Sequence, residues 1–309
     1  MIKLIRRKFK TLFNLVYNKP IGTIYMLHRV HPFEKNKLSL NENMKVSPEF
    51  LEQFILERLD QYEFLSLDQA IAVLEKKIKL TKPFIVFTLD DGYADNYTYA
   101  FPIFQKYNIP FIVYISTGFI DRFSLLWWYQ LEDIIMNNNS IKLSNGMCFS
   151  CESSTEKESS FLAIRKIILE LPTTDFDNQL RELLSNYTLN FEAYSEKLML
   201  NWDQIILMSQ SPLCTIGAHT ITHRRLSELS QNELSKEIRE SKAVLEAKIK
   251  QEIEHFAYPF GTSFEVNEPV VNAVKLSGFA SAIYANGGVI RKQDKDLFRL
   301  NRTMLVETK

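Results

Sequence analysis

Hydrophobic and polar positions alternate along this chain in a way that predicts strands separated by helices. Short apolar runs rich in β-branched and aromatic residues are typical of buried strands. Such runs occur at residues 21–27, 84–89, 111–115, 213–216, 255–258 and 278–284. Most of the segments between them place apolar residues at helical spacing, namely 48–59, 67–74, 97–107, 202–208, 231–249 and 270–276. This alternation predicts a parallel sheet with covering helices.

Two helix starts carry clear capping signals. Ser47-Pro48-Glu49 combines a hydroxyl cap, a proline at the first helical position and an acid in the first turn. Ser230 and Glu233 have the spacing of a capping box. We therefore expect helices to begin directly after Ser47 and Ser230.

The segment from Asn137 to Ser160 interrupts this rhythm, since it is rich in Asn, Ser and Glu. Within it, two short strand-like runs flank Asn145-Gly146, a pair typical of a two-residue hairpin turn. Two predicted helices follow, at 161–171 and 176–187. We interpret residues of about 120–200 as an insertion beside the main fold, and such insertions often shape a substrate site.

The run 84–89 ends in Asp90-Asp91-Gly92. Desolvating a carboxylate is costly, so both acids are expected where the strand leaves the sheet. Ligands bind at the carboxyl ends of strands in parallel α/β folds. Adjacent acids point in different directions, so one can bind a metal while the other faces substrate. The alternative is a simple turn, which Asp before Gly also favours.

Two of the five histidines form His219-x-x-x-His223 directly after a predicted strand. This spacing brings both imidazoles within reach of one ion. Thr220 stands where the His-Glu-x-x-His metalloproteases require Glu, which disfavours that chemistry. Two histidines and one carboxylate suit zinc or a related divalent ion and leave a position for water. The alternative is two surface histidines at chance spacing.

Composition narrows the classes of function. The chain has 309 residues, enough for one large domain or two, and 46% are hydrophobic. It carries 37 basic and 37 acidic residues, which argues against nucleic-acid binding as its main role. Three cysteines are too few for a disulfide framework. Cys148 and Cys151 give only a weak zinc signal.

The N-terminal residues 1–19 form a separate pattern, a basic amphipathic helix. The pattern favours a helix packed on its own domain, with a membrane-surface anchor as the alternative. We expect no transmembrane helix, because no run is long and apolar enough. We expect no secretory signal peptide either, because an unbroken apolar region and a small-residue cleavage site are missing.

Three separated motifs resemble those of the polysaccharide deacetylases, also called the NodB-homology group or carbohydrate esterase family 4. They are Thr88-Leu-Asp-Asp-Gly92, His219-Thr-Ile-Thr-His223 and Tyr258-Pro-Phe-Gly261, in the family's order. The resemblance runs from about residue 20 to 302 and is weakest across the insertion. It implies that residues 20–309 form one α/β domain, a distorted (β/α)7 barrel. It also implies metal-dependent removal of N-acetyl groups from a glycan.

The resemblance implies a role for each matching residue. Asp90 becomes the general base, and one divalent ion is held by Asp91, His219 and His223. Zinc is the favoured ion, with cobalt, nickel and manganese as alternatives. The backbone N–H of Phe260 stabilises the oxyanion. Three further positions lie on the substrate side: Thr220, which either holds the loop or contacts acetate, and Tyr258 and Pro259.

Two departures from the family pattern concern the catalytic groups. Ala257 stands where the family often has an arginine that orients the base, and Arg299 or Arg302 is a candidate replacement. The late Leu-x-His motif that supplies the general acid is missing, since no histidine follows His255. Some family members resemble a circular rearrangement with an early histidine. We therefore predict His28 as the general acid, with a structural role as the alternative.

The remaining candidates stay open at this stage. His31 is expected in a loop and His255 in a structural role. Trp127, Trp128 and Tyr129 either line a sugar-stacking groove or pack the insertion. The expected partner is an N-acetylated glycan or its sugar precursor in the bacterial cytoplasm or at the inner membrane surface. The alternatives are a deformylase or other amidohydrolase on a lipid-linked sugar, and a glycan-binding protein without turnover.

Overall fold

The computed structural model describes residues 19–308, and the N-terminal helix predicted at 1–19 lies, except for Lys19, outside them. The strands are β1 Pro20–Leu27, β2 Arg29–Val30, β3 Lys45–Val46, β4 Glu63–Phe64, β5 Phe84–Leu89, β6 Phe111–Ile115, β7 Ser140–Lys142, β8 Cys148–Ser150, β9 Cys214–Ala218, β10 His255–Ala257, β11 Ser281–Ile283, β12 Ile290–Arg291 and β13 Thr303–Met304. The α-helices are α2 Ser39–Glu42, α3 Pro48–Leu56, α4 Leu67–Leu74, α5 Phe101–Lys106, α6 Thr117–Ile120, α7 Trp127–Met136, α8 Ser154–Leu169, α9 Phe176–Leu183, α10 Phe191–Leu198, α11 Trp202–Ser209, α12 Gln231–Ile249 and α13 Glu268–Leu276.

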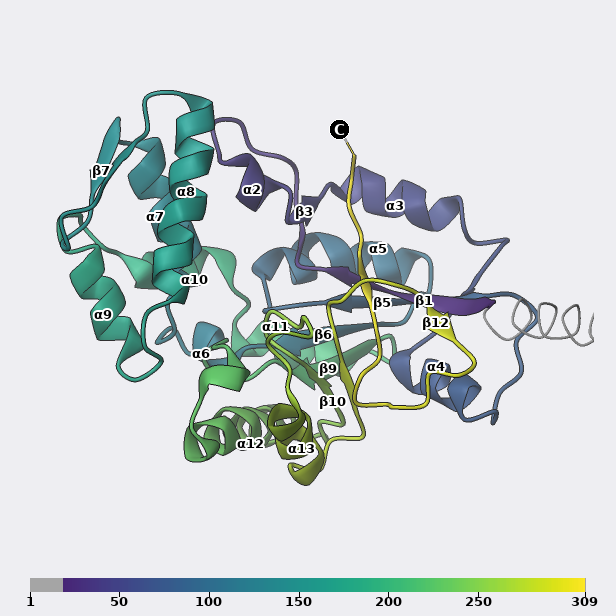
Figure 1. Ribbon diagram of the computed structural model, residues 1–309. Helices are drawn as coiled ribbons and strands as arrows, with labels where there is room; N and C mark the ends of the chain where they lie inside the picture. The colour runs from purple at the N-terminus through teal and green to yellow at the C-terminus, as the bar shows by residue number, and fades with distance from the viewer. Residues whose placement is uncertain (1–18, 309) are drawn as a thin grey trace, which may run out of the picture.

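One nine-stranded sheet organises the described part of the chain, in the order β11-β10-β9-β6-β5-β1-β12, with β13 beside β1 and β4 beside β5. Its central pairs are parallel, and β12 joins β1 antiparallel. The sheet curls into a half-barrel, with α3 and α5 on one side and α12 and α13 on the other (Figure 1). The predicted fold class, a distorted α/β barrel, is confirmed.

Local sequence signals explain most of these elements. All six residues of β5 are buried, as the continuous apolar run predicts for a central strand. Ser47 caps α3 and Ser230 forms the predicted capping box of α12. The helix predicted at 97–107 has two parts, a π-helical turn at Asn96–Ala100 and then α5. Pro102 lies in the first turn of α5, where its missing N–H is tolerated.

The insertion forms a lobe of its own at one end of the sheet, where α7 to α10 lie beside the β7–β8 hairpin (Figure 1). It has a separate hydrophobic core, which includes Ile141, Phe161, Ile164 and Leu180. The hairpin is present, but its predicted two-residue turn is wrong. A β-turn runs from Leu143 to Gly146, and Gly146 adopts a φ of 88° before the second strand begins.

Within residues 19–308, no helix combines the length and the apolarity needed to cross a bilayer. The three cysteines, Cys148, Cys151 and Cys214, all carry free thiols.

Candidate metal and catalytic centre

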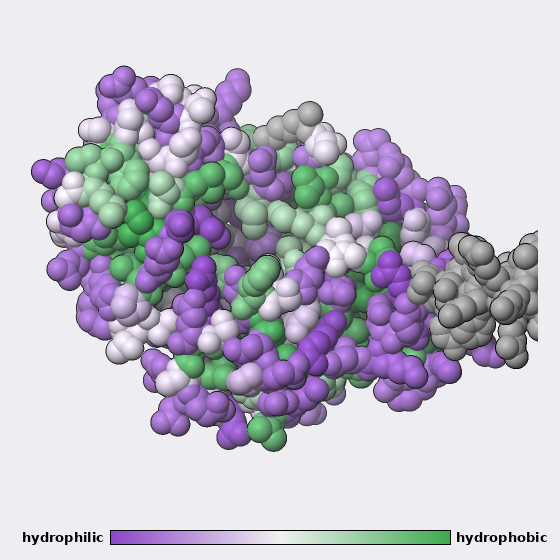
Figure 2. All heavy atoms as spheres, viewed as in Figure 1, coloured by the Kyte–Doolittle hydropathy of each residue, from purple (hydrophilic) through white to green (hydrophobic). Residues whose placement is uncertain are grey.

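The carboxyl ends of four parallel strands bring the predicted site residues together. Leu27 of β1 is level with Leu89 of β5, and Ala218 of β9 is level with Phe256 of β10. The residues that follow these strand ends therefore share one edge of the sheet. They open into a cavity of about 460 Å³, visible as the hollow between the insertion lobe and the sheet (Figure 2). The polar residues of its wall include His28, Asp90, Asp91, His219, His223 and Arg302.

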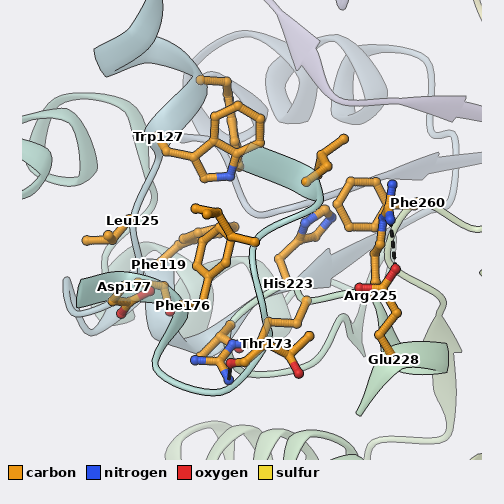
Figure 3. A pocket seen from close by; sticks show the side chains of 16 residues that line it. Phe119, Leu125, Trp127, Thr173, Phe176, Asp177, His223, Arg225, Glu228 and Phe260 are labelled. Carbon is orange, nitrogen blue, oxygen red and sulfur yellow. Dashed lines mark hydrogen bonds and ion pairs between the residues drawn. The ribbon is translucent and has the colours of Figure 1, made fainter. Parts of the chain in front are cut away.

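A smaller pocket of about 50 Å³ adjoins this cavity on the insertion side (Figure 3). The two share four wall residues, namely Trp127, Trp128, His223 and Phe260. In Figure 3, His223 and Phe260 lie side by side, and their ring centroids are 5.0 Å apart. The aromatic residues that the sequence left undecided therefore line the hollow, where the insertion meets the barrel.

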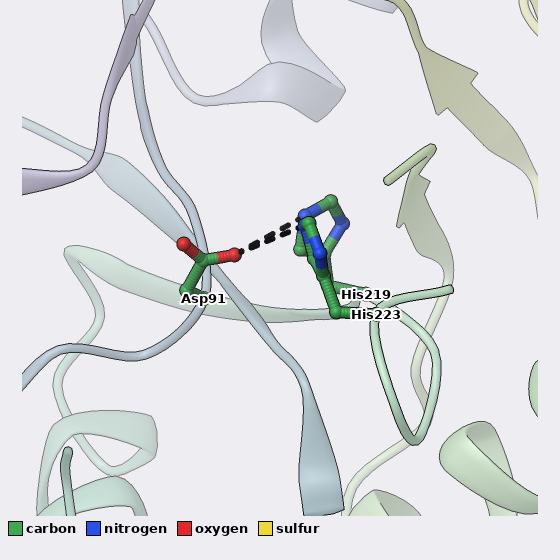
Figure 4. Close-up of side chains that lie close together, drawn as sticks. All are labelled: Asp91, His219 and His223. Atoms are coloured by element: carbon green, nitrogen blue, oxygen red, sulfur yellow. Dashed lines mark ion pairs between the residues drawn. The ribbon is translucent and has the colours of Figure 1, made fainter. Parts of the chain in front are cut away.

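Asp91, His219 and His223 converge on one point, as Figure 4 shows. The Nε2 atoms of His219 and His223 lie 3.5 and 3.4 Å from Asp91 Oδ1. All three ligand atoms lie within 4.8 Å of one another. The carboxylate oxygen is buried and has no hydrogen-bond donor among the described residues. Two imidazole nitrogens and one carboxylate oxygen fit a divalent ion such as zinc.

The protonation of these residues also fits a cation. His219 Nδ1 lies 2.7 Å from the carbonyl oxygen of Ala257 and donates to it, which leaves Nε2 free to bind a metal. Burial lowers the pKa of both His219 and His223 to about 4, so both rings are neutral at pH 7. Burial raises the pKa of Asp91, and the positive groups that lower it, Arg302 among them, do not outweigh this desolvation.

The loops that carry the ligands are unusual in backbone conformation. Asp91 and Gly92 have successive positive φ angles of 72° and 86°. A side chain at Gly92 would also meet Ile115 Cδ1 at 2.9 Å, so glycine is required there. Thr220 and His223 adopt positive φ as well, and Thr220 Oγ1 accepts a hydrogen bond from the His223 N–H.

This contact gives Thr220 the first of its two predicted roles, because its buried side chain holds the loop and is not part of the cavity wall. Its contact with acetate stays a prediction. Glu237 of α12, which no sequence signal identified, supports the same loop. Its carboxylate accepts hydrogen bonds from the backbone N–H groups of Ile221 and Thr222 and from the Thr222 hydroxyl.

Asp90 is held by Arg302. The guanidinium donates to both carboxylate oxygens, at 2.6 and 2.5 Å, and both side chains are almost fully buried. Burial alone would raise the pKa of Asp90, but the Arg302 charge and its hydrogen bonds outweigh burial and lower it to about 2. Of the two arginines predicted as replacements at this position, Arg302 is therefore the one in place. Arg299 instead pairs with Asp296 and Glu268.

The other predicted residues lie around this pair. His28 lines the cavity, and its buried Nδ1 has no hydrogen-bond partner among residues 19–308. Phe260 has a φ of 60°, and no described residue accepts a hydrogen bond from its N–H. Tyr258 lines the cavity while its hydroxyl donates to the Phe298 carbonyl. Pro259 is buried and is not part of the cavity wall.

Two histidines lie outside the wall of the main cavity, namely His255, which was predicted to be structural, and His31, which was predicted to lie in a loop. His255 is buried between the Ser281 hydroxyl and Asp68, at 2.9 and 3.0 Å. His31 follows β2, and its Nδ1 lies 2.7 Å from the Pro32 carbonyl oxygen.

Comparison with known proteins identifies the fold and the family. The family model described as polysaccharide deacetylase matches residues 77–145 and 169–282, together more than half of the chain. The chain belongs to the polysaccharide deacetylase family. Membership indicates a hydrolase that deacetylates carbohydrates. The match omits the segments that carry His28, Arg302 and residues 146–168 of the insertion.

Solved structures agree on the fold of this polysaccharide deacetylase. The Streptococcus pyogenes deacetylase PplD, solved with acetate, matches with a TM-score of 0.61 and 19% identity, over 93% of this chain and 94% of that one. IcaB from Ammonifex degensii matches with a TM-score of 0.60 and 17% identity, over 93% of each chain. The BpsB deacetylase domain from Bordetella bronchiseptica matches with a TM-score of 0.57 and 15% identity, over 92% of this chain and 95% of that one. A comparison with curated proteins found no match.

Proposed function

We propose that this protein is a metal-dependent hydrolase that removes N-acetyl groups from a sugar of a cell-surface glycan or its precursor. One observation carries the proposal. Three metal-type donors from two loops converge beside an ionised, arginine-held carboxylate, in a cavity large enough for a sugar. A binding site alone would not need this combination of a metal triad and a buried base.

Four residues of the centre each have one task in the proposed reaction. Asp90 takes a proton from the attacking water, and Arg302 keeps its carboxylate oriented and ionised. The N–H of Phe260 donates to the oxyanion that develops at the acetyl carbonyl. His28 donates a proton to the nitrogen as the C–N bond breaks, so that acetate and the free amine leave.

The ligand set Asp91, His219 and His223 would hold the divalent ion, with zinc favoured because imidazole and carboxylate ligands suit it. When bound, such an ion lowers the pKa of water and polarises a carbonyl group. Tyr258 lines the cavity beside these groups, and we propose that it contacts the sugar.

The decisive experiment measures acyl release from N-acetylated oligosaccharides and lipid-linked sugars, with added zinc, with chelator and with zinc restored. We expect acetate that appears with zinc, disappears with chelator and returns with zinc. Asp90→Asn is the matched control, because it keeps the metal ligands and removes the base. Acetate release that survives both chelation and this substitution would overturn the proposal.

The same panel separates the two alternatives. Formate release from N-formylated analogues, without acetate release from the N-acetylated substrates, would indicate a deformylase. Glycan binding with no release, by protein shown to hold one equivalent of metal, would indicate a binding protein.

We also propose that the protein works in the bacterial cytoplasm and contacts the inner membrane surface through its N-terminal residues. The support is the basic amphipathic pattern of residues 1–18, which lie outside the described structure. Full-length protein should co-sediment with anionic vesicles, and protein lacking residues 2–18 should not. Equal sedimentation of both proteins would overturn this part of the proposal.

A further inference from the structure

The insertion helix α8 presents two different faces. One is buried in the insertion core, at Phe161, Ile164 and Ile168. A neighbouring stripe at helical spacing lines the hollow: Leu162 and Arg165 at the main cavity, and Leu169 at the adjoining pocket. The helix therefore places one guanidinium, between two leucines, in the wall that faces the catalytic centre.

Arg165 is half-buried and has no hydrogen bond or ion pair with any residue from 19 to 308. The carboxylate that attracts it is Glu265, which is beyond ion-pair distance and is bonded to the Thr262 hydroxyl. Burial and the positive charge of Arg225 both lower the pKa of Arg165. An arginine in a half-buried wall with a second positive charge nearby is costly unless an anion offsets it.

Arg225 comes from the other side of the hollow, two residues after the metal ligand His223. Its Nη1 pairs with Glu228 at 2.7 Å, while its Nε is buried and lacks a partner within the described structure (Figure 3). Its guanidinium lies 5.9 Å from the ring centroid of Phe260, which both pockets share. The two arginines thus flank the place where the cavity meets the smaller pocket.

We propose that Arg165 and Arg225 form a subsite for an anionic oxygen group, a phosphate or a carboxylate, that the glycan carries next to its N-acetylated sugar. This inference rests on the proposed deacetylase function and names its substrate class. Guanidinium groups bind such oxyanions with two parallel hydrogen bonds. Arg165 lies in the segment 146–168 that the family match omits, and Arg225 lies in the matched part, so the subsite would combine one residue of the insertion with one of the family domain.

The test uses three N-acetylated oligosaccharides. They differ only in one group next to the reacting sugar, which is a hydroxyl, a phosphate or a carboxylate. The wild-type protein should favour a charged substrate by about ten- to hundredfold in kcat/KM, as charge-assisted hydrogen bonds allow. The better of the two charged substrates identifies the group. The preference should shrink as ionic strength rises.

Two variants assign the preference to the subsite. Arg165→Gln should lower it about tenfold, and Arg165→Lys should restore part of it, because a lysine keeps the charge but not the bidentate geometry. Lys166→Gln is the matched control on the same helix. The Lys166 side chain is 78% exposed, and its substitution removes the same positive charge. This variant should keep the wild-type preference. An equal loss in both glutamine variants would mean general electrostatics and would overturn the subsite.

Equilibrium binding of the same three glycans to Asp90→Asn protein separates this inference from the proposed function. Acetate release from all three substrates with no preference, and equal binding, would overturn the subsite and leave the deacetylase intact. Tighter binding of a charged glycan that Arg165→Gln abolishes, without acetate release from any substrate, would support the subsite and overturn the proposed function.

Discussion

The bidentate pair between Asp90 and Arg302 is the contact on which the centre most depends. Both side chains are almost fully buried, at 3% and 1% exposure. Arg302 is fixed in turn, because it donates to the Tyr284 carbonyl and to the Thr88 hydroxyl. Removing one partner of such a pair lowers the free energy of unfolding by more than the intact pair contributes to it. The reason is that the other charge stays buried without a partner.

Arg302→Leu should therefore destabilise the fold by about 3–5 kcal/mol and abolish acetate release. Urea unfolding followed by circular dichroism measures the first effect. Arg299→Leu is the matched control, since it removes a more exposed ion pair and should cost at most about 1 kcal/mol. Adding Asp90→Asn to Arg302→Leu should recover stability but not activity. Equal stability of the two single arginine variants would contradict this account.

His28 gives a second prediction at the residue scale. His28→Gln should lower kcat for an N-acetyl sugar by about 10²–10⁴-fold, because the leaving amine loses its proton donor. An aryl acetate ester, whose phenolate departs without a proton, should be cleaved nearly as fast as by the wild type. His31→Gln, outside the main cavity wall, is the control. An equal loss on amide and ester would assign His28 a structural role instead.

At the scale of elements, α12 positions the loop that carries the two histidines. The helix begins at its capping box, and about two turns into it Glu237 accepts three hydrogen bonds from Ile221 and Thr222. The loop includes residues with positive φ, Thr220 and His223, so it depends on such contacts to keep its shape. A helix that supplies no metal ligand thus helps to determine where two of the ligands lie.

Glu237→Ala should weaken metal binding about tenfold, the size usual for groups that support metal ligands. Two backbone N–H groups lose their acceptor, so the loop becomes free to move. Glu240→Ala, at an exposed position of the same helix, should leave the affinity unchanged. Competition with a zinc indicator measures both. A Glu237→Ala protein that binds zinc as tightly as the wild type would show that the loop holds its shape alone.

At the scale of the whole molecule, three hydrophobic cores lie within residues 19–308, two of them in the sheet domain and one in the insertion. The main core packs around the sheet and α12, while the insertion has its own core around α7 and α8. The metal-type ligands all follow strands of the sheet, whereas Trp127, Arg165 and the leucines of α8 come from the insertion. The catalytic groups therefore rest on the sheet, whereas part of the cavity wall rests on the insertion core.

This division predicts how damage to the insertion spreads. Ile164 is fully buried in the insertion core, so Ile164→Ala should destabilise the protein by about 2–5 kcal/mol. Metal affinity should stay at the wild-type value, while KM for the glycan rises because the wall of the cavity shifts. Calorimetric titration with zinc and steady-state kinetics measure the two effects. A parallel loss of metal affinity would show that the main core and the insertion core act as one.

The amino-acid sequence by itself determined most strands of the central sheet, several of the helices that cover it and the metal-type ligands. Short apolar runs rich in β-branched and aromatic residues favour buried strands, and acids or histidines that follow them are expected at the sheet edge. Asp90, Asp91, His219 and His223 were therefore identifiable, and the structure brings all four together. Caps at Ser47 and Ser230 were readable because they depend only on neighbouring residues.

Only the tertiary structure decided which distant residues meet at this edge. Arg302 lies more than 200 residues after Asp90, and nothing local distinguishes it from Arg299. Glu237 and Arg165 look like ordinary charged residues of helices until the fold places one under the histidine loop and the other in the cavity wall. Long-range contacts of this kind depend on how distant segments pack in the tertiary structure, and local periodicity does not indicate that packing.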